Sequence, residues 1–167
     1  GTWNEELTYK IQYITNQNTN WAYIGEGYST KENYTVETLN MSDQWILSKL
    51  ESTIATVRKH MDQYDFHVVG AELYRFIWND FCDWYIELAK INMNDTTKSV
   101  LVWVLTDILK MLHPFMPYVT EEIYQMLPIH DETIMTSSYP VYDATYAFDT
   151  ELDDVIELIQ KIRKAKV

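Results

Sequence analysis

A chain of 167 residues with 47% hydrophobic and 14% aromatic residues can bury a core, which excludes an intrinsically disordered protein. Its formal net charge of −12 argues against a general nucleic-acid binder, because such proteins gain affinity from Lys and Arg side chains that displace counterions from phosphates. Four glycines and four prolines are few chain breakers for this length, so we predict an all-α fold of long helices, and any RNA contact must be local.

Residues 1–38 form a polar N-terminal segment, rich in Asn, Thr and Tyr, that we expect to pack on the rest of the domain. A short helical pattern ends at the run Asn16–Asn20, whose short polar side chains compete for backbone hydrogen bonds. The aromatic residues that follow form either a lid over the core or a stacking surface for bases, and they are Trp21, Tyr23, Tyr28 and Tyr34.

Residues 39–127 carry the helical patterns of the predicted bundle core. The first long helix starts at a cap supplied by Asn40 or Ser42, with Asp43 in its first turn. Apolar residues at helical spacing carry this helix to about Tyr64.

The central helix of the bundle is predicted to run from about Phe66 to Ile91, with Asp65 as its cap. Gly70 inside it is predicted to mark a close helix crossing. A stripe this aromatic needs partner helices on more than one side, because each large ring has roughly 150–250 Å² to remove from water. Its apolar stripe consists of Tyr74, Ile77, Trp78, Phe81, Trp84, Tyr85 and Leu88.

Two further helices complete the predicted core. Asp95 or Thr96 caps a third long helix, which ends at the run His113–Pro117 because proline lacks an N–H and disfavours helix in the residue before it. Thr120 then caps a short helix to about Met126.

The last part of the chain is predicted to be an extended excursion over residues 128–149, β-like at 133–139, and a C-terminal helix over residues 150–167. Asp149 or Thr150 caps this helix, which is cut off while still in pattern. We expect all these parts to form one domain, excised from a longer chain.

Cys82 is the only cysteine, which excludes an internal disulfide and a thiolate metal site and favours a reducing, cytoplasmic setting. Its aromatic neighbours predict a small buried hydrophobe rather than a nucleophile paired with His113. No apolar run approaches the roughly 20 residues of a membrane span, and no signal pattern opens the chain, so no membrane partner is expected.

Asp80 and Asp83 lie three residues apart and are predicted to project from the same side of the central helix. Paired carboxylates could hold a metal or perform acid–base chemistry, or they could buttress neighbouring helices through Tyr, Trp or Arg75. A carboxylate metal bundle uses Glu-x-x-His pairs, and no histidine here has a glutamate three residues before it. The residues alone therefore predict a helical bundle without a catalytic or metal centre.

Three blocks of sequence carry a resemblance to a known family. Taken in chain order, the three blocks given below resemble the anticodon-binding helical domain of class I valyl-tRNA synthetases. The resemblance covers about residues 39–167. The blocks are Asp43–Leu50, similar to D-R-W-I-L-S-K-L with Gln44 in place of the usual arginine, Phe76–Lys90, and Leu112–Gln125, close to L-H-P-F-M-P-F-V-T-E-E-I-W-Q.

The resemblance implies a helical bundle of the class Ia aminoacyl-tRNA synthetase anticodon-binding type. It implies two partners, the tRNA-Val anticodon loop and the catalytic domain of the same polypeptide. The family's catalytic motifs, of the His-x-Gly-His and Lys-Met-Ser-Lys-Ser types, are missing from this chain. The fragment is therefore expected to bind no cofactor, with ATP and magnesium used by the parent enzyme.

The resemblance also implies tRNA contacts. Lys10, matched to the family's N-K-L-W-N helix, would contact a phosphate or a base edge, and Tyr28, matched to its E-G-F turn, would stack on a base. The Asn-rich run between them departs from the family pattern. Trp21 and Lys31 would support them, while Arg163 and Lys164 would contact the RNA backbone, so the tRNA-binding candidates are Lys10, Trp21, Tyr28, Lys31, Arg163 and Lys164.

Two rival hypotheses remain beside RNA binding. One is a non-catalytic protein-interaction or structural module whose acidic surface docks on a basic partner, and the other is a carboxylate-bridged metalloenzyme. Binding to an anticodon stem-loop with strong salt dependence separates the first rival from RNA binding. The second rival requires tightly bound metal that is lost on mutation of Asp80 and Asp83.

Overall fold

The computed structural model describes Glu5 and residues 39–91, 94–127 and 132–166, and the account below concerns this part of the chain. The predicted all-α fold is confirmed, since the described residues form helices joined by turns and include no strand. None of these helices is both long enough and apolar enough to cross a bilayer. In chain order they are α3 (Met41–Asp62), α4 (Phe66–Tyr74), η3 (Arg75–Tyr85), α5 (Ile86–Ile91), α6 (Asp95–Leu112), α7 (Pro117–Gln125), η4 (Ile134–Thr136), η5 (Ala144–Tyr146) and α8 (Leu152–Ala165).

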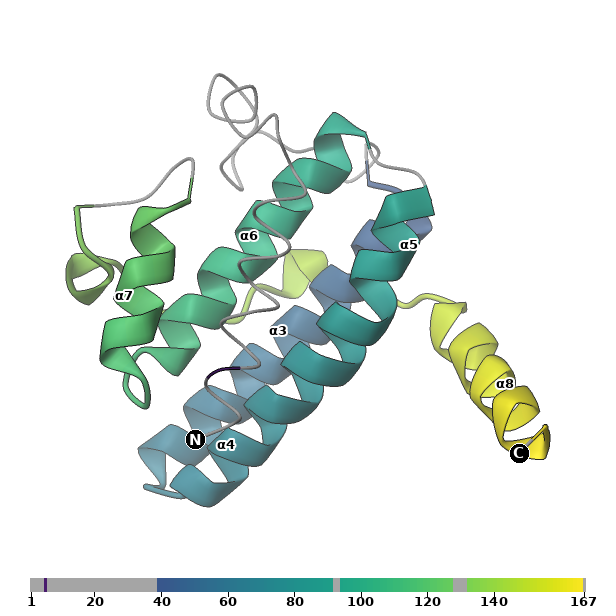
Figure 1. Cartoon of the computed structure of the whole chain (residues 1–167). Coiled ribbons are helices and arrows are strands. Elements are labelled where there is room, and N and C mark those ends of the chain that lie inside the picture. Colours follow the sequence, from purple (N-terminus) through teal and green to yellow (C-terminus); the bar gives the residue numbers. More distant parts are fainter. Residues whose placement is uncertain (1–4, 6–38, 92–93, 128–131, 167) are drawn as a thin grey trace.

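Helix α3 is the element against which most of the fold packs. It contacts α4, η3, α6, η5 and α8, while α7 packs against α6. Figure 1 shows the continuous rod of α4, η3 and α5 running along α3, with α8 projecting from the opposite side of the molecule to α7. The sequence places the centre of the bundle in residues 66–91, whereas the structure places it in α3.

The rod of α4, η3 and α5 has the predicted bounds, Phe66 to Ile91, but its middle is not an α-helix. Residues 75–85 are wound as a π-helix, in which backbone hydrogen bonds join residues five apart. Phe76 and Phe81, five residues apart, are therefore both buried, and so are Asp80 and Tyr85. The different winding leaves part of the predicted stripe outside the core, with Tyr74 half exposed.

A buried carboxylate connects three of these helices. Asn40 and Asp43 form a reciprocal capping box at the start of α3, with Asp43 N donating to Asn40 Oδ1 at 2.8 Å, so the predicted Asn40 cap is confirmed. The fully buried Asp43 carboxylate also accepts hydrogen bonds from Tyr85 Oη of η3 at 2.7 Å and Thr97 Oγ1 of α6 at 3.2 Å. Burial raises the pKa of Asp43, although these hydrogen bonds lessen the rise.

The predicted cap of α6 is wrong by one residue. Asn94 caps the helix, since its Oδ1 accepts a hydrogen bond from Thr97 N at 2.8 Å. Asp95 and Thr96 lie inside the helix instead. Asparagine is at least as good an N-cap residue as aspartate, so the sequence did not determine which of the adjacent polar residues caps α6.

The predicted cap of α7 is also wrong. The helix begins at Pro117, whose fixed φ suits the first helical position and whose missing N–H leaves no donor unsatisfied there. Thr120 is consequently inside the helix, where its hydroxyl donates to Met116 O at 2.8 Å and lies 2.9 Å from His113 Nδ1.

The C-terminal part differs from its prediction at two places. Residues 134–136 form a 3-10 turn rather than a β-like stretch, and the side chain of Thr133 accepts from Met135 N. Neither Asp149 nor Thr150 caps α8, whose N-terminal flanking residue, Glu151, makes no side-chain capping bond. The start of α8 is held by tertiary contacts, which are described below.

We expect Gly70→Ala to raise the free energy of unfolding by about 0.5–1 kcal/mol, because alanine loses less backbone entropy than glycine in a helix. A Cβ built at Gly70 meets no atom within 4 Å, so the predicted close helix crossing is wrong and the methyl group has room. Urea unfolding measures the effect. The exposed Ala71 of the same helix provides the matched control, since Ala71→Gly should lower stability by a similar amount. A loss of stability in Gly70→Ala would contradict this expectation.

We expect the free energy of unfolding of Asp43→Asn, minus that of the natural chain, to increase as the pH rises. A carboxyl group whose pKa is raised by folding binds more protons in the folded state, so its contribution to stability falls as pH increases from about 4 through the folded pKa. Asparagine does not titrate and lacks this loss. Urea unfolding between pH 4 and 8 measures the difference, and a difference that stays flat would refute the raised pKa. In Tyr85→Phe, loss of a hydrogen bond to the carboxylate should move the transition to higher pH.

Candidate nucleic-acid interface

The C-terminal end of α8 concentrates positive charge on an otherwise acidic chain. Four of the chain's 13 Lys and Arg residues lie within residues 161–166, whereas the first turn of the helix carries Asp153 and Asp154. The acidic residues lie at the N-terminal end of α8 and the basic residues at its C-terminal end, where each complements the helix dipole. The exposed cationic residues of this end are Lys161, Arg163, Lys164 and Lys166.

The start of α8 is fixed to α3 by a carboxylate. Asp153 Oδ1 accepts a hydrogen bond from Trp45 Nε1 at 2.9 Å. The same oxygen forms an ion pair with Lys49 Nζ, also at 2.9 Å. Burial acts to raise the pKa of Asp153, but the bonds from Trp45 and Lys49 outweigh it and hold that pKa below its ordinary value. Leu152 and Ile156 bury their side chains in the core beside this contact, so the first turns of α8 are the anchored ones.

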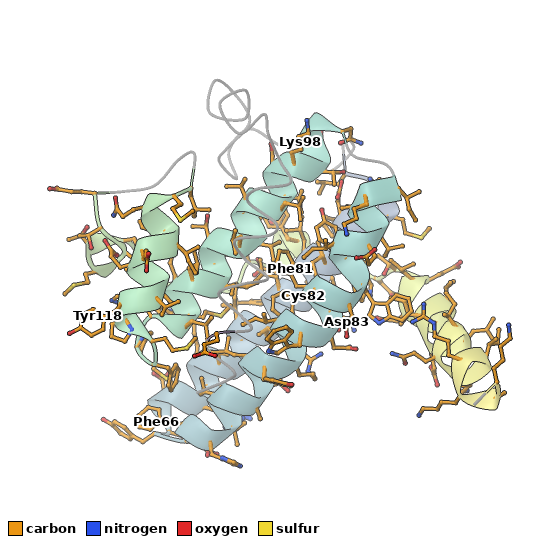
Figure 2. All side chains as sticks on the ribbon, in the orientation of Figure 1. Phe66, Phe81, Cys82, Asp83, Lys98 and Tyr118 are labelled. Carbon is orange, nitrogen blue, oxygen red and sulfur yellow. The ribbon has the colours of Figure 1, made fainter. Side chains whose placement is uncertain are left out.

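The far end of α8 is positioned by a cation–π contact. The guanidinium of Arg163 lies 5.2 Å from the centroid of the Trp84 ring, and Trp84 belongs to η3 and is 9% exposed. Such contacts contribute about 0.5–1 kcal/mol at exposed sites. The interaction keeps the cationic end of α8 close to the rod, where Figure 2 shows Asp83 on the side that faces α8.

An open groove of about 400 Å³ lies between the rod and α8. Its lining combines both signs of charge with apolar surface and consists of Asp83, Trp84, Glu87, Leu88, Lys90, Ile91 and Arg163. Lys90 Nζ lies 3.1 Å from Glu87 Oε1, so an acidic group offsets part of the positive charge inside the groove. A phosphate is repelled by two carboxylates here and is better accommodated at the tip of α8.

Lys164 and Lys166 are the cations of the tip that retain the most unbalanced charge. Lys161 pairs with Glu157 at 3.4 Å, and Arg163 covers Trp84. Within the described residues, no carboxylate forms an ion pair with Lys164 or Lys166. Their positions at the exposed end of a helix suit contact with the phosphates of a nucleic acid, which bind by charge without needing a pocket.

The structure places two of the six predicted tRNA-binding residues. Arg163 and Lys164 lie next to each other at the tip of α8. Lys10, Trp21, Tyr28 and Lys31 lie outside the described residues, as does the rest of the polar N-terminal segment apart from Glu5, so their roles stay predictions. Sequence reasoning missed the Trp84 partner of Arg163, because nothing in the local pattern of a buried aromatic stripe indicates which distant cation will cover it.

The predicted pairing of Asp80 and Asp83 on one side of the helix is wrong. Asp80 is buried and its Oδ2 accepts from Arg75 at 2.8 Å, whereas Asp83 is exposed in the groove. In the π-helix, residues five apart become neighbours, which joins Arg75 to Asp80 and rotates Asp83 away. The predicted hydrogen bond between Asp80 and Arg75 is confirmed, but both residues belong to η3, so this bond does not buttress a neighbouring helix. No cluster of three or more metal-ligating side chains occurs in the part of the chain that the structure describes.

The predicted role of Cys82 as a small buried hydrophobe is confirmed, since it is 7% exposed within the core cluster. His113 Nδ1 lies instead 2.9 Å from Thr120 Oγ1, where the ring helps fix the turn between α6 and α7. Both residues therefore have structural roles.

We expect Asp153→Ala to lower the free energy of unfolding by about 1–3 kcal/mol, because it leaves the buried Trp45 indole N–H without its acceptor. Thermal and urea unfolding measure the loss. The neighbouring exposed Asp154 supplies the matched control, since Asp154→Ala should change stability little. Equal effects of the two substitutions would show that Asp153 does not anchor α8.

Comparison with known proteins identifies one family and a set of similar enzymes. The family model described as "Anticodon-binding domain of tRNA ligase" matches residues 43–167. Similar proteins include the valine–tRNA ligases of Staphylococcus epidermidis, 45% identical over 154 residues, and of Staphylococcus carnosus, 44% identical over 153 residues. The valine–tRNA ligase of Staphylococcus aureus strain MRSA252 is 43% identical over 154 residues. Each match covers 86% of this chain but only 18% of the relative.

Proposed function

Because this chain belongs to the family of anticodon-binding domains of tRNA ligases, we propose that it binds the anticodon loop of tRNA-Val as one domain of a valine–tRNA ligase. The match over residues 43–167 carries this proposal, together with relatives that are themselves valine–tRNA ligases. It favours RNA binding over a purely structural or protein-interaction module.

The physical chemistry of an unpaired loop suits the residues available. Bases in a single-stranded loop can be splayed out and stacked on aromatic rings, while Lys and Arg hold the phosphates. We assign the phosphate contact to Lys164, with Lys166 and the predicted Arg163 beside it, because this end of α8 is cationic and exposed. Base stacking is assigned to Tyr28 and a contact to a phosphate or a base edge to Lys10, with Trp21 and Lys31 as support.

The rest of the reaction belongs to other parts of the ligase under this proposal. Aminoacylation with ATP and magnesium takes place in a catalytic domain of the same polypeptide, and this domain holds the tRNA in position. The proposed setting is the cytoplasm. Such a division fits a chain that spans about a fifth of the length of the relatives it matches.

Fluorescence anisotropy with a labelled tRNA-Val anticodon stem-loop tests the proposal, beside a loop with a swapped anticodon. We expect tighter binding to the valine loop and affinity that falls with salt. Equal, salt-sensitive binding would limit the contacts to phosphates, and absence of binding at low salt would favour the structural module.

The contribution of α8 can be tested separately with Lys164→Gln. Loss of one phosphate contact should weaken binding to both loops alike and reduce the slope of log K against log salt by about 0.7. Lys98→Gln is the matched control, because Lys98 lies near the start of α6, away from the tip of α8 in Figure 2. A variant that binds both loops with the original salt slope would exclude Lys164 from the interface.

A further inference from the structure

Three aromatic rings are exposed where the turn between α3 and α4 meets the turn between α6 and α7. Tyr64 is 80% exposed, Phe66 48% and Phe115 39%. The rings contact one another edge to face, with centroids 6.2 Å apart for Tyr64 and Phe66 and 6.4 Å apart for Phe66 and Phe115. These three residues form the aromatic corner, and Figure 2 labels its middle member, Phe66, at the lower end of the rod.

The backbone of the aromatic corner holds Tyr64 in an unfavourable conformation. Its φ is 58°, and within the described residues it is the only non-glycine residue with positive φ. Tyr64 N donates to Met61 O at 3.0 Å and Asp65 N donates to His60 O at 2.8 Å, which is the hydrogen-bond pattern of a Schellman turn. That turn favours glycine at this position. A strained tyrosine that directs its ring into solvent is therefore a candidate functional residue.

The two segments that carry the aromatic corner contain carboxylates but no Lys or Arg, and the cation that precedes them in sequence is Lys59 in the last turn of α3. Residues 62–67 and 113–118 contain two aspartates, two histidines and no Lys or Arg. Asp62 is exposed, and Asp65 makes no side-chain capping bond, while its Oδ2 lies 3.4 Å from His60 Nδ1. Two carboxylates beside three rings repel phosphates. The same arrangement complements an apolar protein surface that carries arginine or lysine.

We propose that the aromatic corner docks on another domain of the same polypeptide, at an apolar pocket rimmed by basic side chains. Tyr64 and Phe66 fill the pocket, and the basic rim pairs with Asp62 and Asp65. This inference rests on the proposed function, in which the chain is one domain of a ligase whose relatives are covered to only 18% of their length. Buried aromatic anchors with a polar rim are the usual anatomy of such interfaces.

Hydroxyl-radical footprinting tests the docking by comparing this chain alone with a full-length ligase that contains it. Tyr64 and Phe66 should be oxidised about tenfold more slowly in the full-length ligase, as expected when a ring that is 80% exposed becomes as buried as the core. Tyr142, 47% exposed, and Met135, 77% exposed, serve as controls whose rates should not change. Equal rates for Tyr64 in the two samples would overturn the proposal.

Two further arms identify other occupants. Protection of Tyr64 in the isolated chain by the anticodon stem-loop would assign the aromatic corner to RNA, and protection that grows with chain concentration would assign it to a second copy. Either result would overturn docking on another domain. RNA affinity is measured independently by anisotropy, so failure of the proposed function and failure of the docking proposal give different results.

Tyr64→Gly tests the anchor itself without threatening the fold, because glycine is preferred at this backbone position. The isolated variant should keep its helical circular dichroism and an equal or higher Tm. In the full-length ligase, Phe66 should lose its protection, whereas Tyr142→Ser should leave it intact. Protection of Phe66 that survives Tyr64→Gly would overturn the assignment of Tyr64 as the anchor.

Discussion

The buried carboxylate of Asp43 is the interaction on which the arrangement of the helices depends. A charge removed from water is costly unless hydrogen bonds replace its hydration, and here the replacements come from the N-cap of α3 and from two other helices. The backbone of Asn40 precedes α3, the hydroxyl of Tyr85 belongs to η3, and that of Thr97 belongs to α6. A shift of any one helix along its axis would leave the carboxylate short of a donor. The network therefore selects one register for the bundle.

That register also positions the cationic surface. Tyr85 follows Trp84 directly in η3, so fixing the tyrosine hydroxyl on Asp43 also fixes the indole that Arg163 covers. At the other end of α8, Trp45 lies on α3 two residues after Asp43 and donates to Asp153. Both ends of α8 are thus connected to the buried network through neighbours in sequence. The position of the exposed helix α8 is therefore determined by contacts with residues next to the buried network.

Periodicity in the sequence predicted the extents of the long helices, because burial of apolar residues on one face decides them. It could not predict caps such as that of α7, where Thr120 was the predicted start but the helix begins at Pro117, whose fixed φ suits the first helical position. Nor did it reveal the π-helix, since large apolar residues three to five positions apart fit either winding, and this misplaced Asp83. For the candidate site, the run of cations was visible, but the contact of Arg163 with Trp84 depends on long-range packing.

The separation of charge along α8 has a consequence for the kinetics of association. A chain with a net charge of −12 repels a polyanion from most directions, while the end of α8 at Lys164 and Lys166 attracts it. Encounters in the wrong orientation are then rejected at a distance of about a Debye length, roughly 8 Å at physiological ionic strength. Under the proposed RNA-binding function, electrostatic steering of this kind would select the orientation of approach before any base is contacted. An acidic protein can in this way gain directional selectivity from the same charge that makes it a poor general binder.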